Sequence, residues 1–95
     1  MNAEEFMKDH ADKACAGRIP EIMGDLTPEA MQQIMPMVPQ MPNPAQSNSV
    51  VSVASNDGDH VFDVTYSGDG KQLTMRETVR EVDGKWRIVK LEQPA

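Results

Sequence analysis

Cysteine is almost absent from this chain, and histidines and aromatic residues are few. A single cysteine, Cys15, excludes an intramolecular disulfide, and two separate histidines give no metal-ligand spacing. We therefore predict no metal site and no cofactor, with Cys15 acting as a small hydrophobic residue inside a helix. Only four aromatic residues are present, so the eight methionines are expected to fill much of the core.

Basic residues are also few: nine Lys and Arg stand scattered against fifteen Asp and Glu, for a net charge of −6. Nucleic acids and anionic membranes bind basic patches, so neither is an expected partner. No apolar run approaches the length of a membrane span, and the first residues do not resemble an export signal, so we expect a cytoplasmic protein. Phosphate-binding loops and nucleophile motifs are absent as well, and no motif indicates an enzyme class.

Alternating, β-branched residues dominate the second half of the chain, from Ser49 to Glu92. Three Asp-Gly turns, at residues 57–58, 69–70 and 83–84, separate four such runs. Asp-Gly between alternating apolar runs is a strong hairpin signal, because a two-residue type I′ turn needs a positive φ at both positions. Residues 48–92 are therefore predicted to form a four-stranded antiparallel meander.

Two-residue loops also fix which residues share a face of the sheet. The predicted inner, core-facing rows are Ser49–Tyr66–Leu73, Val51–Val64–Met75, Val53–Phe62–Glu77–Lys90 and Ser55–His60–Val79–Ile88. The predicted outer rows are Ser52–Asp63–Arg76–Leu91, Ala54–Val61–Thr78–Val89 and Asp59–Arg80–Arg87. The outer face is thus half polar, with an apolar stripe through its middle.

Residues 2–35 follow helical spacing and predict three short helices. Asn2 is expected to cap the first helix, which stops at Gly17. The second starts near Ile19, with Gly24 as its C-cap, and Thr27 caps the third, which ends at Pro36. The third helix is expected to bury Ala30, Met31, Ile34 and Met35.

A proline-rich connector, residues 36–47, joins the two halves. Its first prolines are three residues apart, which matches the polyproline II repeat and predicts a stiff strap with Val38 and Met41 packed over the sheet. The alternative is a docking peptide for a proline-recognition domain, which is disfavoured because no Lys or Arg flanks it.

Glu77 is a carboxylate in the middle of the predicted inner face, where burial is costly without a partner. One interpretation makes it a general base, with His60 and Tyr66 as polar helpers and Lys90 tuning its pKa. The favoured interpretation is a partly exposed pair with Lys90, worth roughly 0.2–1 kcal/mol, because both side chains can reach water. Glu77 and His60 are thus only weak catalytic candidates. The ligand-pocket candidates are Phe62, Tyr66, Met75, Glu77 and Lys90.

Arg80 faces Arg87 on the predicted outer face, and like charges directly opposite are destabilising unless an anion intervenes. An apolar stripe rimmed by charge also suggests an interface. We predict a homodimer through this face. The candidate interface residues are Val61, Arg76, Thr78, Arg80, Arg87 and Val89.

Helices followed by a meander that closes on Asp83-Gly-Lys-Trp-Arg-Ile-Val resemble the nuclear transport factor 2-like (cystatin-like α+β) superfamily. Its members often end on a strand of the form Asp-Gly-x-Trp-x-Ile, and residues 16–30 resemble the second helix and the turn after it. The resemblance implies a cone: helices on a concave sheet, a pocket at the open end and dimerisation through the sheet. The chain is short for this superfamily, so the pocket is expected to be shallow or filled. No position matches the catalytic motifs of the superfamily's isomerases and cyclases.

The sequence as a whole predicts one α+β domain over residues 1–95. Its expected function is that of a non-catalytic domain that dimerises through its sheet and binds a small apolar molecule in the concave pocket. The alternative is an isomerase- or polyketide-cyclase-like enzyme with Glu77 as general base.

Overall fold

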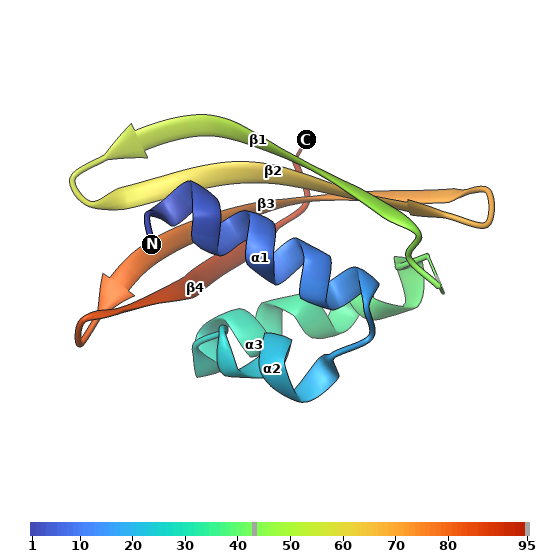
Figure 1. Ribbon diagram of the computed structural model, residues 1–95, viewed down its shortest axis with the longest axis horizontal. Coiled ribbons are helices and arrows are strands. Elements are labelled where there is room, and N and C mark those ends of the chain that lie inside the picture. The colour runs from blue at the N-terminus through green and yellow to red at the C-terminus, as the bar shows by residue number, and fades with distance from the viewer. Residues whose placement is uncertain (43, 95) are drawn as a thin grey trace.

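The computed structural model describes residues 1–42 and 44–94, and in it helices pack against a four-stranded sheet (Figure 1). Helix α1 crosses one face of the sheet, α2 packs against α1, and α3 packs against β4 (Figure 1). The helices are α1 (Ala3–Cys15), α2 (Ile19–Gly24), α3 (Pro28–Ile34) and the 3₁₀ helix η1 (Met35–Gln40). The strands are β1 (Ser47–Asn56), β2 (Asp59–Gly68), β3 (Lys71–Val82) and β4 (Lys85–Glu92), paired in the order β1-β2-β3-β4. The α+β class and the antiparallel meander are confirmed.

The three Asp-Gly turns have the geometry that the sequence predicts. Asp57, Asp69 and Asp83 have φ between 50° and 53°, and each following glycine also has a positive φ. This is the type I′ requirement, and it sets the strand pairing beside each turn. The predicted register between β2 and β3 is confirmed along its whole length, including Phe62 opposite Glu77.

A β-bulge in β1 makes the predicted register wrong in the first half of that strand. Ser52 lies opposite Phe62 and Ala54 opposite Val61, so Val53 is an extra residue. Val50, instead of Val51, therefore faces the core opposite Val64. The remaining inner-face position at this end is Asn48, which lies opposite Tyr66 and donates to Asp12 of α1.

A second bulge, in β4, corrects the predicted neighbours of Glu77. Ile88 lies opposite Val79 as predicted, but Lys90 lies opposite Thr78, and Val89 is the extra residue. Leu91 therefore faces Glu77 on the inner side, in the place predicted for Lys90. The bulge puts an apolar side chain in the core and leaves the ammonium group in water, which avoids the cost of burying a charge.

The predicted helix starts are confirmed. Asn2 and Glu5 form a reciprocal capping box on α1, Gly17 ends it with a φ of 74°, and Thr27 caps α3. The C-cap prediction for α2 is wrong, because Gly24 is the last helical residue and Asp25 is the cap.

The polyproline strap is wrong for residues 36–40 of the connector. Residues 35–40 form η1, which buries Met37 and leaves Val38 exposed, whereas Met41 packs against the core as predicted. A 3₁₀ helix and polyproline II both have about three residues per turn, so proline spacing does not separate them. Met35 is 63% exposed, against the prediction that α3 buries it. Asn43 of the predicted connector lies outside the described residues.

The outer edge of β4 is closed by the segment between α2 and α3. Ile88 N donates to Asp25 O at 2.8 Å, and Thr27 N donates to Ile88 O at 3.0 Å. Further along the same edge, Leu91 N donates to Gln33 Oε1 of α3 at 2.7 Å. These contacts satisfy edge groups of β4 and fix Asp25 against the sheet.

Candidate functional site

Glu77 is the most unusual residue of the core. Its side chain is 1% exposed on the inner face of β3, and Oε2 has no hydrogen-bond partner among the described residues. Burial raises the pKa of this carboxyl to about 7, although the nearby His10 charge opposes the rise. The carboxyl group is therefore partly protonated near neutral pH, which is the condition that a general acid or base needs.

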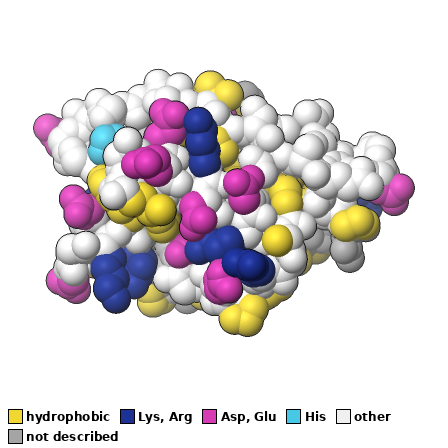
Figure 2. Space-filling view, in the orientation of Figure 1, with side chains coloured by type: hydrophobic (Ala, Val, Ile, Leu, Met, Phe, Trp, Pro, Cys, Tyr) yellow, Lys and Arg dark blue, Asp and Glu magenta, His cyan; other side chains and the backbone are white. Residues whose placement is uncertain are grey.

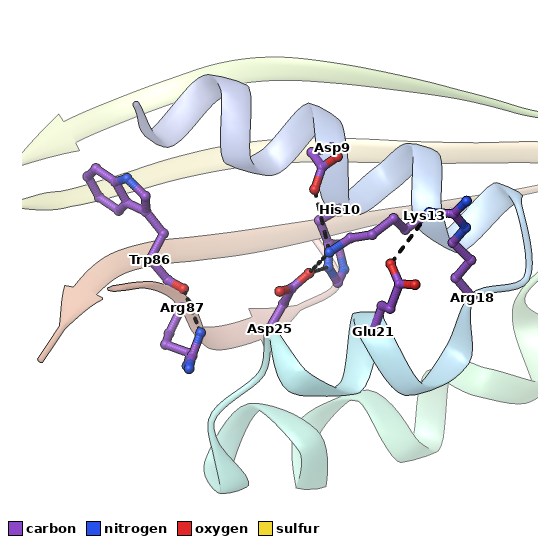
Figure 3. Close-up of polar contacts among 8 residues, drawn as sticks. All are labelled: Asp9, His10, Lys13, Arg18, Glu21, Asp25, Trp86 and Arg87. Carbon is purple, nitrogen blue, oxygen red and sulfur yellow. Dashed lines mark hydrogen bonds and ion pairs between the residues drawn. The ribbon is translucent and has the colours of Figure 1, made fainter. Parts of the chain in front are cut away.

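Next to Glu77, a polar cluster joins α1 to the start of the α2–α3 connection (Figure 3). His10 Nδ1 lies 2.8 Å from Asp25 Oδ2, and Lys13 Nζ lies 3.0 Å from the same oxygen. Burial alone would raise the pKa of Asp25, but hydrogen bonds from His10 and Lys13 outweigh it and lower that pKa. Asp25 therefore stays ionised and fixes the orientation of the buried imidazole.

Helical spacing brings His10 and Lys13 to this cluster, because residues three apart lie on the same side of a helix. Burial lowers the pKa of Lys13, but contacts with Asp25 and then Asp9 more than offset it and raise the pKa. Asp25 lies opposite these two residues because its carbonyl accepts a hydrogen bond from Ile88 N of β4. Asp25 thus completes a contact between the first helix and the last strand.

The structure brings together four of the five predicted pocket residues. Phe62, Tyr66, Met75 and Glu77 share the inner face and are each no more than 3% exposed, so this face is a filled core. Burial, and then the negative charge of Glu77, raise the pKa of the Tyr66 phenol, which therefore stays protonated.

Lys90 and His60 lie away from Glu77, contrary to the predicted cluster. The bulge at Val89 puts Lys90 on the outer side, where its Nζ lies 3.9 Å from Glu92. His60 stays near its turn, where its ring and that of Trp86 form an edge-to-face contact and Nδ1 lies 3.2 Å from Ser55 Oγ. Neither residue can tune Glu77 by direct contact.

Sequence reasoning missed His10 and Asp25 as partners. The spacing of His10 from Phe6 was a usable signal, because these residues lie on one face of α1 and their rings stack. Asp25 had no such signal. Its position depends on a single parallel bridge between Leu26 and Ile88, which periodicity does not reveal.

The outer face of the sheet carries two bidentate ion pairs, one on each side of an apolar row. Arg76 binds both carboxylate oxygens of Asp63, at 2.9 and 3.0 Å, and Arg80 binds both of Asp59, at 2.6 and 3.0 Å. These contacts lower the pKa of both aspartates. Arg87 donates instead to the carbonyl of Trp86 at 3.1 Å. Contacts within one chain therefore offset the predicted repulsion between Arg80 and Arg87.

Between those ion pairs lie the half-buried Val61, Thr78 and Val89. They line a hollow of about 520 Å³. Its remaining lining residues are Gln33, Ala54, Asn56, Asp59, Arg80 and Lys90. All six predicted interface residues thus share the outer side. Four of them line this hollow: Val61, Thr78, Arg80 and Val89.

A second hollow, of about 350 Å³, lies along α3 and is lined mostly by apolar residues. Its lining residues are Leu26, Pro28, Met31, Gln32 and Met35.

Within residues 1–42 and 44–94, no group of three or more His, Cys, Asp or Glu residues could hold a metal ion. No described helix is both long and apolar enough to cross a membrane. No protein-family model, curated protein or solved structure matches this chain.

Proposed function

We propose that this chain is a non-catalytic interaction domain that pairs with a second copy of itself through its sheet. The carrying observation is a group of valines on strands that no described helix covers from the outer side. Val51 and Val53 on β1 are 57% and 44% exposed, and the half-buried Val61 and Val89 line the hollow on the outer side. Uncovered apolar side chains rimmed by polar residues are typical of protein interfaces.

Native mass spectrometry of the purified protein tests this function, because it weighs the assembly and any retained ligand together. We expect a dimer whose fraction grows with protein concentration. A monomer at every concentration would refute the proposal. Binding of a small apolar molecule on the inner face stays a prediction, and it requires Phe62, Tyr66 and Met75 to move apart. A dimer with additional retained mass would support it.

The nuclear transport factor 2-like cone is part of the same proposal. It is supported by α1 crossing one face of a meander and by the final hairpin, in which Trp86 and Ile88 of β4 follow Asp83-Gly84. Ile88 is buried at the centre of the core, whereas Trp86 packs beside the last turn. A crystal structure of the protein in which the sheet lacks concave curvature would contradict the cone.

The second candidate function, an isomerase- or cyclase-like enzyme, is favoured by one observation. Glu77 combines an unpartnered oxygen with a pKa of about 7, and a base in this range can remove a proton next to a carbonyl group. Hydrogen–deuterium exchange into a panel of enolisable ketones tests this function. Exchange by the wild type that is lost in Glu77→Gln would support the enzyme, and equal exchange by both would exclude Glu77 as the base.

A further inference from the structure

The two edges of the sheet differ in whether their backbone groups have partners. The β4 edge is closed by Asp25, Thr27 and Gln33. In contrast, among residues 1–42 and 44–94 no hydrogen bond joins the backbone of β1 to any segment other than β2. An edge with unpaired N–H and C=O groups is a template for another strand. The open edge in this molecule is therefore β1.

The two edge strands also differ in charge. From Met31 through Asn56 the chain has no Asp, Glu, Lys or Arg, so β1 is entirely uncharged. Strand β4 carries Lys85, Arg87, Lys90 and Glu92. Charged side chains, lysine above all, are the usual protection of an exposed edge. This protection is present on the covered edge and absent from the open one. In Figure 2 the rim formed by β1 shows almost no charged side chains, whereas acidic and basic groups gather over α1 and below it.

We propose that the two copies join at this edge, with β1 pairing antiparallel to β1 of the second copy to make one continuous eight-stranded sheet. This inference rests on the proposed self-association and names its contact surface. The occupant is a second copy because each chain carries a net charge of −6, and the neutral edge lets two such chains meet with the least repulsion.

Antiparallel pairing of identical strands has twofold symmetry, so the same edge serves both copies. Because the β4 edge is already closed, the sheet cannot extend further, and the assembly ends at a dimer instead of growing into a fibre. Val51 lies near the middle of β1, so an antiparallel pair with full overlap brings its two copies together near the twofold axis. This contact covers the most exposed valine of the sheet.

A matched pair of lysine substitutions separates the edge from the outer face. Ser52→Lys places a charge on the exposed inner side of β1, opposite Phe62, and near its own copy in the paired edge. Thr78→Lys places the same charge in the middle of the outer face, opposite Val61. We expect the dissociation constant of the dimer to rise at least ~10-fold in Ser52→Lys, with little change in Thr78→Lys, as measured by sedimentation velocity with circular dichroism to verify folding.

The outcomes distinguish the two proposals. A wild-type dimer that Thr78→Lys dissociates and Ser52→Lys does not would overturn the edge pairing while keeping self-association. A wild-type monomer would overturn both. Hydrogen exchange of the wild type gives a test without substitutions: amides of β1 must become more protected as protein concentration rises. Unchanged protection of β1 across the dimer transition would also refute the edge pairing.

Discussion

Glu77 links the pH of the solution to the stability of the core. Its pKa rises from the ordinary 4.5 to about 7 on burial, so the folded state holds this proton more tightly than the unfolded state. Its stabilising effect is complete below about pH 4.5 and is lost as the pH rises through about 7, at a total cost of about 3 kcal/mol. Two titratable groups lie near Glu77: His10 of α1 and Tyr66 of β2. His10 in turn contacts Asp25, which also binds Lys13.

Glu77→Gln should therefore remove this pH dependence. We expect the free energy of unfolding of the wild type to fall by about 3 kcal/mol relative to the variant between about pH 5 and pH 8. Urea denaturation at the two pH values measures this difference. Glu81→Gln on the same strand is the control, because Glu81 is exposed. Parallel pH profiles for wild type and Glu77→Gln would contradict the buried titration.

Asp25→Asn tests the ionic cluster. The variant keeps its backbone bonds to Ile88 but loses the charge that His10 and Lys13 contact, and we expect a loss of about 1–3 kcal/mol at neutral pH. Because the folded pKa of Asp25 is lowered, its contribution is present above 3.8 and is lost as the pH falls below that value. The deficit of the variant should thus shrink in acid. Asp9→Asn, which removes an exposed contact with the same lysine, should cost less than about 0.5 kcal/mol. Equal losses in both variants would contradict the cluster.

At the scale of elements, glycine placement gives a matched test of turn and helix. Gly70 has a φ of 76° in the β2–β3 turn, whereas Gly24 ends α2 without a positive φ, and neither has a heavy atom within 4 Å of an added Cβ. Gly70→Ala should cost about 1–2 kcal/mol through backbone strain. Gly24→Ala should instead stabilise by up to about 1 kcal/mol. Thermal unfolding measures both, and a stabilising Gly70→Ala would contradict the left-handed turn.

The sequence predicts features that depend on neighbouring residues better than features that depend on packing. Hairpin turns and helix N-caps depend on a few neighbouring residues, so Asp-Gly and Thr-Pro-Glu predicted them correctly. The bulges at Val53 and Val89 each insert one residue into a strand, and no local sequence pattern indicates such an insertion. Because the bulge at Val89 was not predicted, Lys90 lies outside the predicted site and Leu91 takes its place opposite Glu77. The contact of His10 with Asp25 was missed for the same reason, since it depends on how α1 and β4 pack together.

At the scale of the whole molecule, the salt dependence of association follows from where the charge lies. Two copies with a net charge of −6 repel each other over long range, while the proposed contact at β1 is neutral, and salt screens the repulsion without weakening the contact. We therefore expect the dimer to tighten as sodium chloride rises from about 0.02 M to about 0.5 M, over which the screening length falls to a few ångströms. Sedimentation equilibrium at several salt concentrations measures this change. The alternative contact, the outer face with Arg76 and Arg80 exchanging their aspartates between copies, would weaken over the same range. A dimer that loosens with salt would therefore indicate that the ion pairs of the outer face, and not the neutral edge, hold the two copies together.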